Sequence, residues 1–407
     1  MFRSLCLICS SQNLTRIVDL GMNPYADTFI PESKLSESEP VYPLACNLCT
    51  ACGQIQTVSV TDPMERYALH DYSYTSSNSS FSRSHWEKYA NDVPSKVNLK
   101  NGSFIVEVGS NDGFLSEQLL KQGHRVLGVD PSKYMADLAQ ERGVSTIVAL
   151  FDTKVAEEIH GQNGQADLIV ANNVFNHSNS PLNFTEACSE LLSPSGTFVF
   201  ELPYWLSGLK SGHFDHIYHE HVTYFTVNSA SKLLERCDMG ITGVELVDYH
   251  GGSIRVFAKK QKAIKKESAE AKRIIEQEIL EGAFKPQTYK DFMKNILKQR
   301  NVFLSEIYEI KSRGKPIVAV GAAAKGNTLL NFYNLDNSII DCVTDVSSHK
   351  QGKYTPLTRI PICSDDVFSN YDEVYAFILS WNISKIIKKI LHDINPNIKF
   401  LELGGWS

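Results

Sequence analysis

The densest group of side chains suited to acid–base chemistry lies in a stretch of thirteen residues, HFDHIYHEHVTYF, from 213 to 225. It holds four histidines, an aspartate, a glutamate and two tyrosines. A histidine can take up a proton near neutral pH, a glutamate can orient that histidine, and a tyrosine can donate to a developing oxyanion. We therefore expect Tyr218, Glu220 and His221 to carry a proton-transfer step.

A metal site is the alternative interpretation of the same stretch, because His219 and His221 flank Glu220 and can all supply ligands. Alternate residues of an extended segment diverge, however, which disfavours a shared ion. Some of the four histidines are expected to be ordinary structural residues.

Cysteines form the second group with chemical potential, since five of the nine fall in the first 52 residues. Two C-x-x-C pairs, about forty residues apart, are typical of a structural zinc site, and Gly53 supplies the residue that tolerates positive φ in a knuckle. The predicted ligands are Cys6, Cys9, Cys49 and Cys52. Cys46 also pairs in sequence with Cys49, so it remains a possible substitute. Four cysteines leave no open coordination position, which disfavours a catalytic zinc.

The charge balance excludes several classes of partner. Forty basic against forty-six acidic side chains give −6, and the first 70 residues carry four Lys/Arg against seven Asp/Glu. Neither supplies the positive field that nucleic acid or an anionic membrane needs. No apolar run approaches the about 18 residues of a membrane span. The start shows no secretory signal, so a cytoplasmic protein with reduced thiols is expected rather than a disulfide framework.

The elements that must position this chemistry form a βαβ unit. Residues 104–108 read as a buried strand that breaks into a glycine-bearing turn, followed by a helix at 114–122 and a second strand at 125–130. Gly109 permits the tight turn and Gly113 lets the helix start close to the sheet. Asp130 ends the second strand, where a carboxylate can accept hydrogen bonds from a ribose diol. A plain Rossmann unit that binds NAD is the alternative.

This pattern resembles motif I and the ribose-binding acid of class I S-adenosylmethionine-dependent methyltransferases. Further strands at 167–173 and 197–202 continue the sheet. The resemblance implies the following cofactor-binding residues: Glu107, Gly109, Asn111, Gly113, Asp130 and Asn172.

The last third of the chain predicts a helical connection at 261–313 and a second Rossmann-like sheet, with strands at 317–320, 339–344 and 374–379. A glycine-opened turn with Lys325 at a helix start suits a diphosphate, which backbone amides and one ammonium can hold. The alternative is a tight turn that only packs two domains together.

Motifs along the whole chain occur in the order known from one family. They are C-x-x-C at 6–9, C-x-x-C-G at 49–53, the Tyr/Ser segment at 71–80, E-x-G-S-N-D-G-F-L at 107–115, N-V-x-x-H at 173–177, I-Y-H-E-H at 217–221, H-G-G-S-I-R at 250–255, G-A-A-A-K-G-N at 321–327 and D…K-Q-G-K-Y at 345–354. The chain thereby resembles the zinc-containing C-methyltransferases of bacterial deoxysugar pathways. Two departures from the pattern are Cys46 and Leu357.

The resemblance implies an α/β protein in three parts: a zinc-binding module at 1–70, a methyltransferase domain with its linking segment at 71–260, and a helical connection with a Rossmann-like domain at 261–407. It implies methyl transfer to a carbon, typically carbon 3, of a nucleotide-linked 4-keto-deoxysugar. O- or N-methylation is the alternative, although it would not explain the crowded histidine stretch. The cofactors implied are S-adenosylmethionine and structural Zn²⁺.

The resemblance also assigns roles to individual residues. His221 is the expected base, oriented by Glu220. The residues expected to bind or polarise the sugar are Tyr72, His177 and Tyr218, with Tyr74 as a rival to Tyr72. The residues expected to hold the nucleotide diphosphate are Lys325, Asn327 and Lys350. The nucleotide (dTDP, GDP or CDP) and the sugar stereochemistry stay open, and we expect a monomer or weak oligomer.

Overall fold

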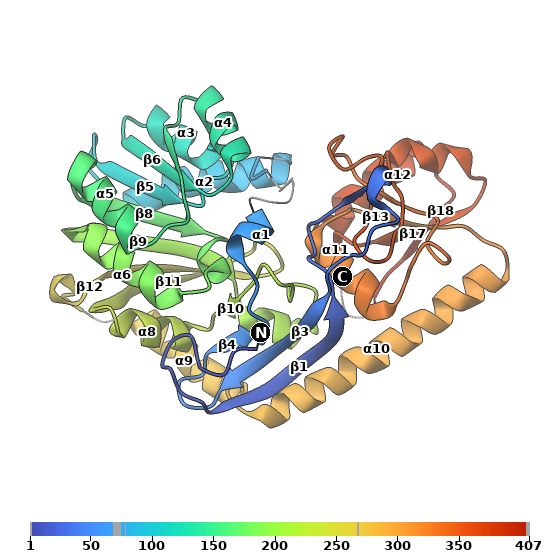
Figure 1. The fold of residues 1–407 in the computed structure, drawn as a ribbon, viewed down its shortest axis with the longest axis horizontal. Coiled ribbons are helices and arrows are strands. Elements are labelled where there is room, and N and C mark those ends of the chain that lie inside the picture. The colour runs from blue at the N-terminus through green and yellow to red at the C-terminus, as the bar shows by residue number, and fades with distance from the viewer. Residues whose placement is uncertain (1, 68–74, 78, 267, 404–407) are drawn as a thin grey trace.

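The computed structural model describes residues 2–67, 75–77, 79–266 and 268–403 of the chain. Figure 1 shows two α/β bodies above a long helix, with the N-terminal strands running beside that helix. Tyr72 and Tyr74 lie outside the described residues.

The central body is a sheet of seven strands in the order β11-β12-β9-β8-β5-β6-β7. The strands from β9 through β8, β5 and β6 to β7 are parallel. At one edge β12 pairs antiparallel with β9, and β11 pairs antiparallel with β12. The strand bounds are β5 (Phe104–Val108), β6 (Arg125–Asp130), β7 (Thr146–Val148), β8 (Ala166–Asn172), β9 (Leu192–Pro203), β11 (Met239–Val247) and β12 (Ser253–Lys260).

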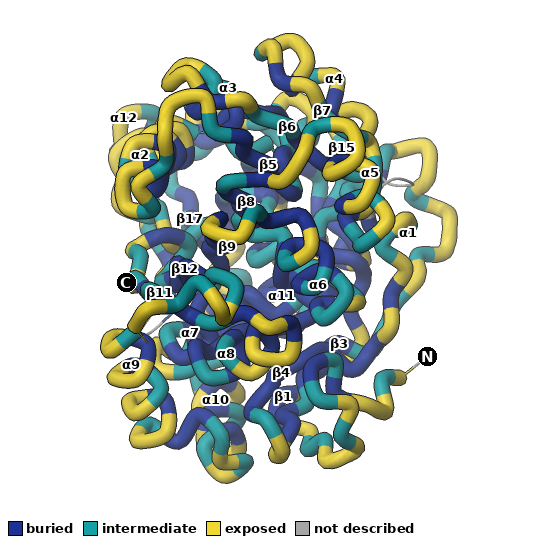
Figure 2. The backbone as a smooth tube through the Cα atoms, turned by 90° about the vertical axis from the view of Figure 1, so that its left-hand side faces the viewer, coloured by how far each residue is buried: buried dark blue, intermediate teal, exposed yellow. Residues whose placement is uncertain are grey.

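Helices pack over this sheet, and its strands are largely buried beneath them (Figure 2). The helix bounds are α2 (Ser80–Lys96), α3 (Phe114–Lys121), α4 (Lys133–Glu141), α5 (Thr153–Asn163), α6 (Pro181–Leu191), α7 (Trp205–Ser211) and α8 (Val227–Glu235). The predicted βαβ unit is confirmed: β5, α3 and β6 follow one another, and β5 pairs with β6 in parallel.

The N-terminal module is built on an antiparallel sheet in the order β1-β3-β4-β10. Its bounds are β1 (Leu14–Asn23), β3 (Tyr42–Cys49), β4 (Ile55–Thr57) and β10 (Thr223–Tyr224), with the short helix α1 (Pro63–Tyr67) after it. Strand β10 comes from the end of the histidine stretch, so the sheet of the zinc module is completed by a segment more than 160 residues further along the chain. This pairing attaches the histidine stretch to the zinc module.

The C-terminal body is a parallel sheet of five strands in the order β16-β14-β13-β17-β18. Its elements are β13 (Ile317–Val320), α11 (Ala324–Tyr333), β14 (Cys342–Thr344), β16 (Ile362–Cys363), β17 (Val374–Ile378), α12 (Ser384–Ile394) and β18 (Ile398–Leu401). The second predicted sheet is therefore present. The strand expected at 339–344 starts only at Cys342, because residues 336–340 form a turn closed by amide hydrogen bonds to the carbonyl of Asp336.

Two helices, α9 (Ala269–Leu280) and α10 (Pro286–Ser312), form the connection between the two α/β bodies, as the sequence predicts. Figure 1 shows α10 passing beneath both bodies, beside β1. One buried apolar cluster joins residues of β1 and β3 to α10 and to α11, among them Ile17, Leu48, Ile296 and Leu330. Since the core of the zinc module is shared in this way, the three parts pack as one structure. A short pairing of β2 (Ile30–Pro31) with β15 (Lys353–Tyr354) adds a further contact.

Candidate active site and metal centre

Four cysteines of the N-terminal module lie together. The sulfur atoms of Cys6, Cys9, Cys49 and Cys52 all lie within 4.8 Å of one another, and the two closest pairs, Cys6–Cys52 and Cys9–Cys49, are 3.5 and 3.6 Å apart. A closed set of four thiolates is the donor set of a structural zinc site. The cluster is consistent with zinc binding. When bound there, the ion supplies bonds that hold the two C-x-x-C turns together.

Local backbone geometry explains why these turns converge. Gly53 has φ +79°, and a Cβ there would approach the ring of Phe284 to 2.8 Å. The side-chain amide of Asn228 on α8 donates to the carbonyl of Cys52 at 3.0 Å, which ties the second turn to the central body. The metal centre thus sits at a junction between two parts of the chain.

Cys46 does not belong to the cluster in the described part of the chain. Its side chain is completely buried, and burial raises the pKa of its thiol far above the ordinary value. It lies on β3 near Tyr224, so it is a core residue rather than a substitute ligand.

The six predicted cofactor residues meet at the carboxyl ends of β5, β6 and β8. Gly109 and Gly113 have φ +71° and +74°, and a Cβ on either would approach Val174 or Ala139 to less than 3.0 Å. The two carboxylate oxygens of Asp130 accept from the backbone amides of Asn111 and Ser132, both at 2.9 Å. The Asp130 carboxylate is thereby held with its remaining lone pairs available to a ligand.

Glu107 and Asn172 complete this edge. Glu107 is buried and accepts a hydrogen bond from the hydroxyl of Ser116, and burial raises the pKa of its carboxyl group to about 8. The side-chain oxygen of Asn172 accepts from the backbone amide of Glu201 at 3.1 Å. The side chain of Asn111 accepts from the backbone amide of Ser76 at 2.8 Å, which attaches the described end of the Tyr/Ser segment to the turn.

The histidine stretch supplies a dyad. The hydroxyl of Tyr218 lies 2.7 Å from Nε2 of His221, and Nδ1 of His221 lies 2.8 Å from the carbonyl of His216. A carbonyl can only accept, so Nδ1 carries the hydrogen and Nε2 of the neutral ring has the lone pair. Burial lowers the pKa of His221 well below its ordinary value. The ring is therefore neutral at pH 7 and in the tautomer that a base requires.

His177 lies beside this dyad, with its ring centroid 5.0 Å from that of His221. Burial and the nearby Arg66 lower its pKa to about 3. Arg66 also donates to the carbonyls of His219, Glu220 and His177 at 3.2 to 3.4 Å. A guanidinium from α1 of the N-terminal module thus joins the two segments that carry His177 and His221.

The expected orientation of His221 by Glu220 is wrong. Both ring nitrogens of His221 are taken by Tyr218 and by the carbonyl of His216. Oε1 of Glu220 instead accepts from the backbone amide of Asp27 at 3.3 Å. Glu220 does not contact His221 because its carboxylate points toward the N-terminal module. The carbonyl of His216 orients the His221 ring instead.

Asp27 is a buried neighbour of Glu220 that the sequence did not reveal. Burial raises its pKa to about 6, and burial together with the charge of Asp27 raises the pKa of Glu220 to about 7. The surrounding sequence, Tyr-Ala-Asp-Thr-Phe, matches no known functional motif. Asp27 comes close to Glu220 only because the N-terminal module packs against the histidine stretch.

His219 takes a structural role. Its Nδ1 donates to the carbonyl of Pro24 at 3.2 Å, and its ring packs edge-on against Tyr25 and Tyr42. It is turned toward the N-terminal module, away from His221. Among the described residues, the four-cysteine group is the one that brings metal-binding side chains together, so the alternative metal site at this stretch finds no support.

The three residues expected to hold a diphosphate lie where the C-terminal body meets the other two parts. Nζ of Lys325 donates to the carbonyl of His250 at 2.9 Å and lies over the ring of Trp381. The side chain of Asn327 donates to the carbonyl of Ala26 at 2.6 Å, and Nζ of Lys350 donates to the carbonyl of Ala322 at 2.6 Å. Nζ of Lys350 also lies over the ring of Phe29, 4.9 Å from its centroid, so all three side chains contact another part of the chain.

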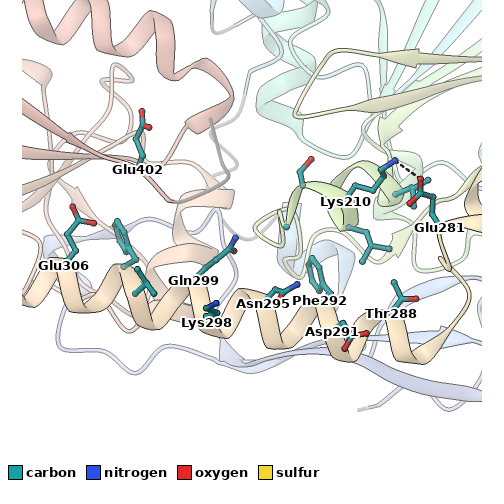
Figure 3. Close-up of a pocket in the computed structure, with 16 residues that line it drawn as sticks. Lys210, Glu281, Thr288, Asp291, Phe292, Asn295, Lys298, Gln299, Glu306 and Glu402 are labelled. Atoms are coloured by element: carbon teal, nitrogen blue, oxygen red, sulfur yellow. Dashed lines mark hydrogen bonds and ion pairs between the residues drawn. The ribbon is translucent and has the colours of Figure 1, made fainter.

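A cavity of about 620 Å³ lies elsewhere, between α7, α10 and the end of the C-terminal sheet (Figure 3). Its lining includes Phe292, Gln299 and Glu402, and an ion pair joins Lys210 to Glu281 at one end. None of the predicted site residues lines it.

A search of the described helices for a stretch long and apolar enough to cross a bilayer finds none.

Comparison with protein families matches three models along the chain. They are described as "Putative zinc binding domain" (residues 6–67), "Methyltransferase domain" (83–241) and "C-methyltransferase C-terminal domain" (248–400). The three models follow the order of the three parts, and the third begins at residue 248, before β12 of the central sheet.

One curated relative is similar over the whole chain. C-methyltransferase NovU of Streptomyces niveus is 31% identical over 400 residues, which cover 98% of this chain and 93% of NovU. The ubiquinone biosynthesis O-methyltransferase of Shewanella halifaxensis is 31% identical over only 101 residues, 24% of this chain and 42% of its own length.

Solved structures of methyltransferases overlap with less than half of the chain. Magnesium protoporphyrin IX methyltransferase of Synechocystis with bound SAM covers 44% of this chain and 80% of its own, at 14% identity and a TM-score of 0.34. An S-adenosylmethionine-dependent methyltransferase of Clostridium acetobutylicum covers 45% and 92%, at 16% identity and a TM-score of 0.35.

Proposed function

The chain belongs to the family of S-adenosylmethionine-dependent C-methyltransferases, and on that premise we propose that it methylates a nucleotide-linked 4-keto-deoxysugar at carbon 3, beside the keto group. The carbon-methylating family disfavours the O- or N-methylation considered as an alternative. The observation that carries the proposal is the dyad of Tyr218 and His221.

A carbon becomes a nucleophile only when its C–H bond is acidic enough to be broken. An adjacent carbonyl makes it so, because the electron pair moves onto the carbonyl oxygen as an enolate. Such a step needs one group that takes the proton and one that donates to the oxyanion. Neutral His221 supplies the first and the hydroxyl of Tyr218 supplies the second.

The two groups are hydrogen-bonded to each other before the sugar binds, at 2.7 Å. We infer that the Tyr218 hydroxyl turns from Nε2 to the carbonyl oxygen of the sugar, which frees the lone pair of Nε2 for the proton. The carbonyl of His216 keeps Nδ1 protonated throughout. When bound, S-adenosylmethionine supplies the methyl group as the electrophile to which the enolate carbon bonds.

The surroundings of the dyad suit this chemistry. His221 is buried and His177 is half-buried, and the burial of His221 limits the access of water that would protonate the enolate. His177 is close enough to His221 to contact the same sugar, and we assign it a binding role. Tyr72 and Tyr74 keep their expected contact with the sugar as a proposal, since they lie outside the described residues.

The nucleotide part of the substrate is assigned to the C-terminal body. Lys325 and Lys350 bring two positive charges, and Asn327 a further polar group, to the side of that body which faces the histidine stretch. The hydroxyl of Thr328 donates to the carbonyl of Ile217 at 3.2 Å, so this body contacts the segment of the dyad directly. A dTDP-, GDP- or CDP-sugar can therefore extend from Lys325 to His221.

Product analysis tests the proposal. The protein is incubated with S-adenosylmethionine and a panel of dTDP-, GDP- and CDP-linked 4-keto-deoxysugars. A product heavier by one methyl group, with a new quaternary or methine carbon at position 3 in its NMR spectrum, supports it. Carbon 5 flanks the same carbonyl. Methylation at carbon 5 would therefore be consistent with the enolate mechanism, but it would show that the proposed position, carbon 3, is wrong.

Isotope exchange tests the mechanism separately. A substrate deuterated at the methylated carbon should lose its label to water in the presence of S-adenosylhomocysteine, because proton abstraction precedes transfer. Methylation on oxygen or nitrogen with full retention of the label would exclude the enolate step.

A further inference from the structure

We propose that His85 is a further substrate-contacting residue, whose Nδ1 accepts a hydrogen bond from a hydroxyl group of the sugar. His85 lies on α2, outside the histidine stretch and the nucleotide-binding turn. The inference rests on the proposed function, because it takes the sugar to lie between the cofactor edge and the C-terminal body. Its basis is a buried arrangement that fixes the His85 ring.

A buried ion pair determines which nitrogen of His85 is free. Glu201 on β9 and Arg255 on β12 are direct partners in the antiparallel ladder, and Nε and a terminal nitrogen of Arg255 donate to one carboxylate oxygen of Glu201 at 2.8 and 2.7 Å. The other oxygen of Glu201 lies 2.6 Å from Nε2 of His85. Since Arg255 already matches the charge of Glu201, the imidazole needs only to donate one N–H, from Nε2.

Nδ1 of His85 is then an acceptor. Within the part of the chain that the structure describes, no hydrogen bond is made to Nδ1. The side chain of His85 keeps 12% of its surface exposed, whereas that of Glu201 is fully covered. A histidine with one nitrogen locked by a carboxylate and the other open is the arrangement that enzymes use to present an oriented acceptor.

Stacking fixes the plane of the ring as well. The rings of His85 and Tyr249 lie 3.8 Å apart and only 3° from parallel. Tyr249 is itself buried, and its hydroxyl donates to Ser82 on the same helix at 3.4 Å. Together with Glu201, this contact leaves the imidazole little freedom to rotate.

His85 lies between the two ends of the proposed substrate site, which are the cofactor edge and Lys325. On one side, the backbone amide of Glu201 donates to Asn172 at the cofactor edge. On the other, the ring of Tyr249 lies 4.0 Å from that of His250, whose carbonyl accepts from Lys325. We infer that a sugar that spans from the cofactor edge to Lys325 lies along this row of residues.

His250 marks the same place independently. Its backbone has φ +55°, an unusual conformation for a histidine, of the kind that is retained at functional sites. Burial, and then the charge of Lys325, lower its pKa well below the ordinary value. Through the ring of Tyr249, His250 connects His85 to the Lys325 side of the proposed site.

Two substitutions separate a substrate contact from a packing role. His85→Gln keeps an amide N–H near the position of Nε2, for Glu201, and removes the acceptor at Nδ1. His85→Asn keeps an oxygen near the position of Nδ1 and removes the donor to Glu201. His392→Gln on the exposed face of α12 is the matched control.

The experiment uses the full chain and the sugar of the panel that the wild type methylates fastest. We expect His85→Gln to lower kcat/KM for the sugar by about tenfold, with the affinity for S-adenosylhomocysteine within twofold of wild type. We expect His85→Asn to retain more activity than His85→Gln but to melt at a lower temperature, because Glu201 loses a partner. If His85→Asn is the more active of the two variants but melts at the lower temperature, the result supports the contact between His85 and the sugar.

Three results would overturn the proposal. Activity that simply follows the melting temperature in both variants would make His85 a structural residue. A tenfold loss of S-adenosylhomocysteine affinity with an unchanged KM for the sugar would move the contact to the cofactor. A wild type that methylates no sugar of the panel would overturn the proposed function, and the role of His85 with it.

Discussion

The backbone amide of Asp27 donates a hydrogen bond of 3.3 Å to the carboxylate of Glu220, a residue 193 positions further along the chain. Through this contact the N-terminal module reaches the stretch that carries the proposed base. The same module contributes Arg66 and completes its sheet with β10. We therefore propose that the four-cysteine cluster supports the geometry of the proposed active site without taking part in its chemistry.

The pair of Asp27 and Glu220 predicts a dependence of stability on pH. Both carboxyl groups have a pKa raised by burial, to about 6 for Asp27 and about 7 for Glu220. A raised pKa means that the folded state holds the proton more tightly than the unfolded state. The stabilisation is present at pH 4 and is lost as the pH rises through about 7.

Glu220→Gln tests this directly, because glutamine stays neutral. Relative to wild type, the variant should gain stability between pH 5 and pH 8, by on the order of 3 kcal/mol at most. Melting temperatures of both proteins at the two pH values measure it. A difference between them that stays constant with pH would show that Glu220 is not buried in its neutral form.

Removal of the proposed base should abolish turnover while the cofactor still binds. General-base catalysis contributes about 10² to 10⁴ in rate, so we expect His221→Asn to lower kcat by at least about a hundredfold. The affinity for S-adenosylhomocysteine, measured by calorimetry, should change little. His160→Asn, on the exposed face of α5, is the control. Turnover equal to wild type in His221→Asn would end the assignment.

The four-cysteine cluster predicts one zinc ion per chain and a specific set of ligands. Cys49→Ser should lose the ion and melt at a much lower temperature, because binding of structural zinc contributes directly to folding. Cys46→Ser should keep a full equivalent of zinc, since Cys46 lies in the core near Tyr224. Measuring the zinc content of the purified variants shows which of Cys46 and Cys49 is a ligand. Loss of zinc from Cys46→Ser would contradict the ligand set.

Substitution of Gly109 should weaken cofactor binding by more than backbone strain alone would. A Cβ at Gly109 would come within 2.7 Å of Val174, whereas a Cβ at Gly143 would meet nothing within 4 Å, although both residues have φ between +70° and +80°. Gly143→Ala should therefore cost only the strain of positive φ, about 1 kcal/mol. Gly109→Ala should also displace the turn and weaken S-adenosylhomocysteine binding by more than tenfold. Calorimetric titration of both variants distinguishes a local clash from general destabilisation.

Local pattern was enough to predict much of the fold. The strand–turn–helix around Gly109 and Gly113 could be predicted because hydrophobic periodicity and the need for positive φ act over a few residues. The same holds for the second parallel sheet and for the helical connection. The candidate ligands Cys6, Cys9, Cys49 and Cys52 could be named because each C-x-x-C turn is local and zinc needs two of them.

The contacts of the functional side chains, in contrast, are known only from the tertiary structure. The sequence places Glu220 next to His221, yet packing turns its carboxylate to Asp27 and gives His221 the carbonyl of His216 instead. Cys46 also forms a C-x-x-C pair in the sequence, but among the described residues its side chain lies outside the group of four sulfur atoms. The His85–Glu201 contact joins residues 116 positions apart. Such contacts depend on which faces of distant elements pack together, and spacing along the chain carries no information about that packing.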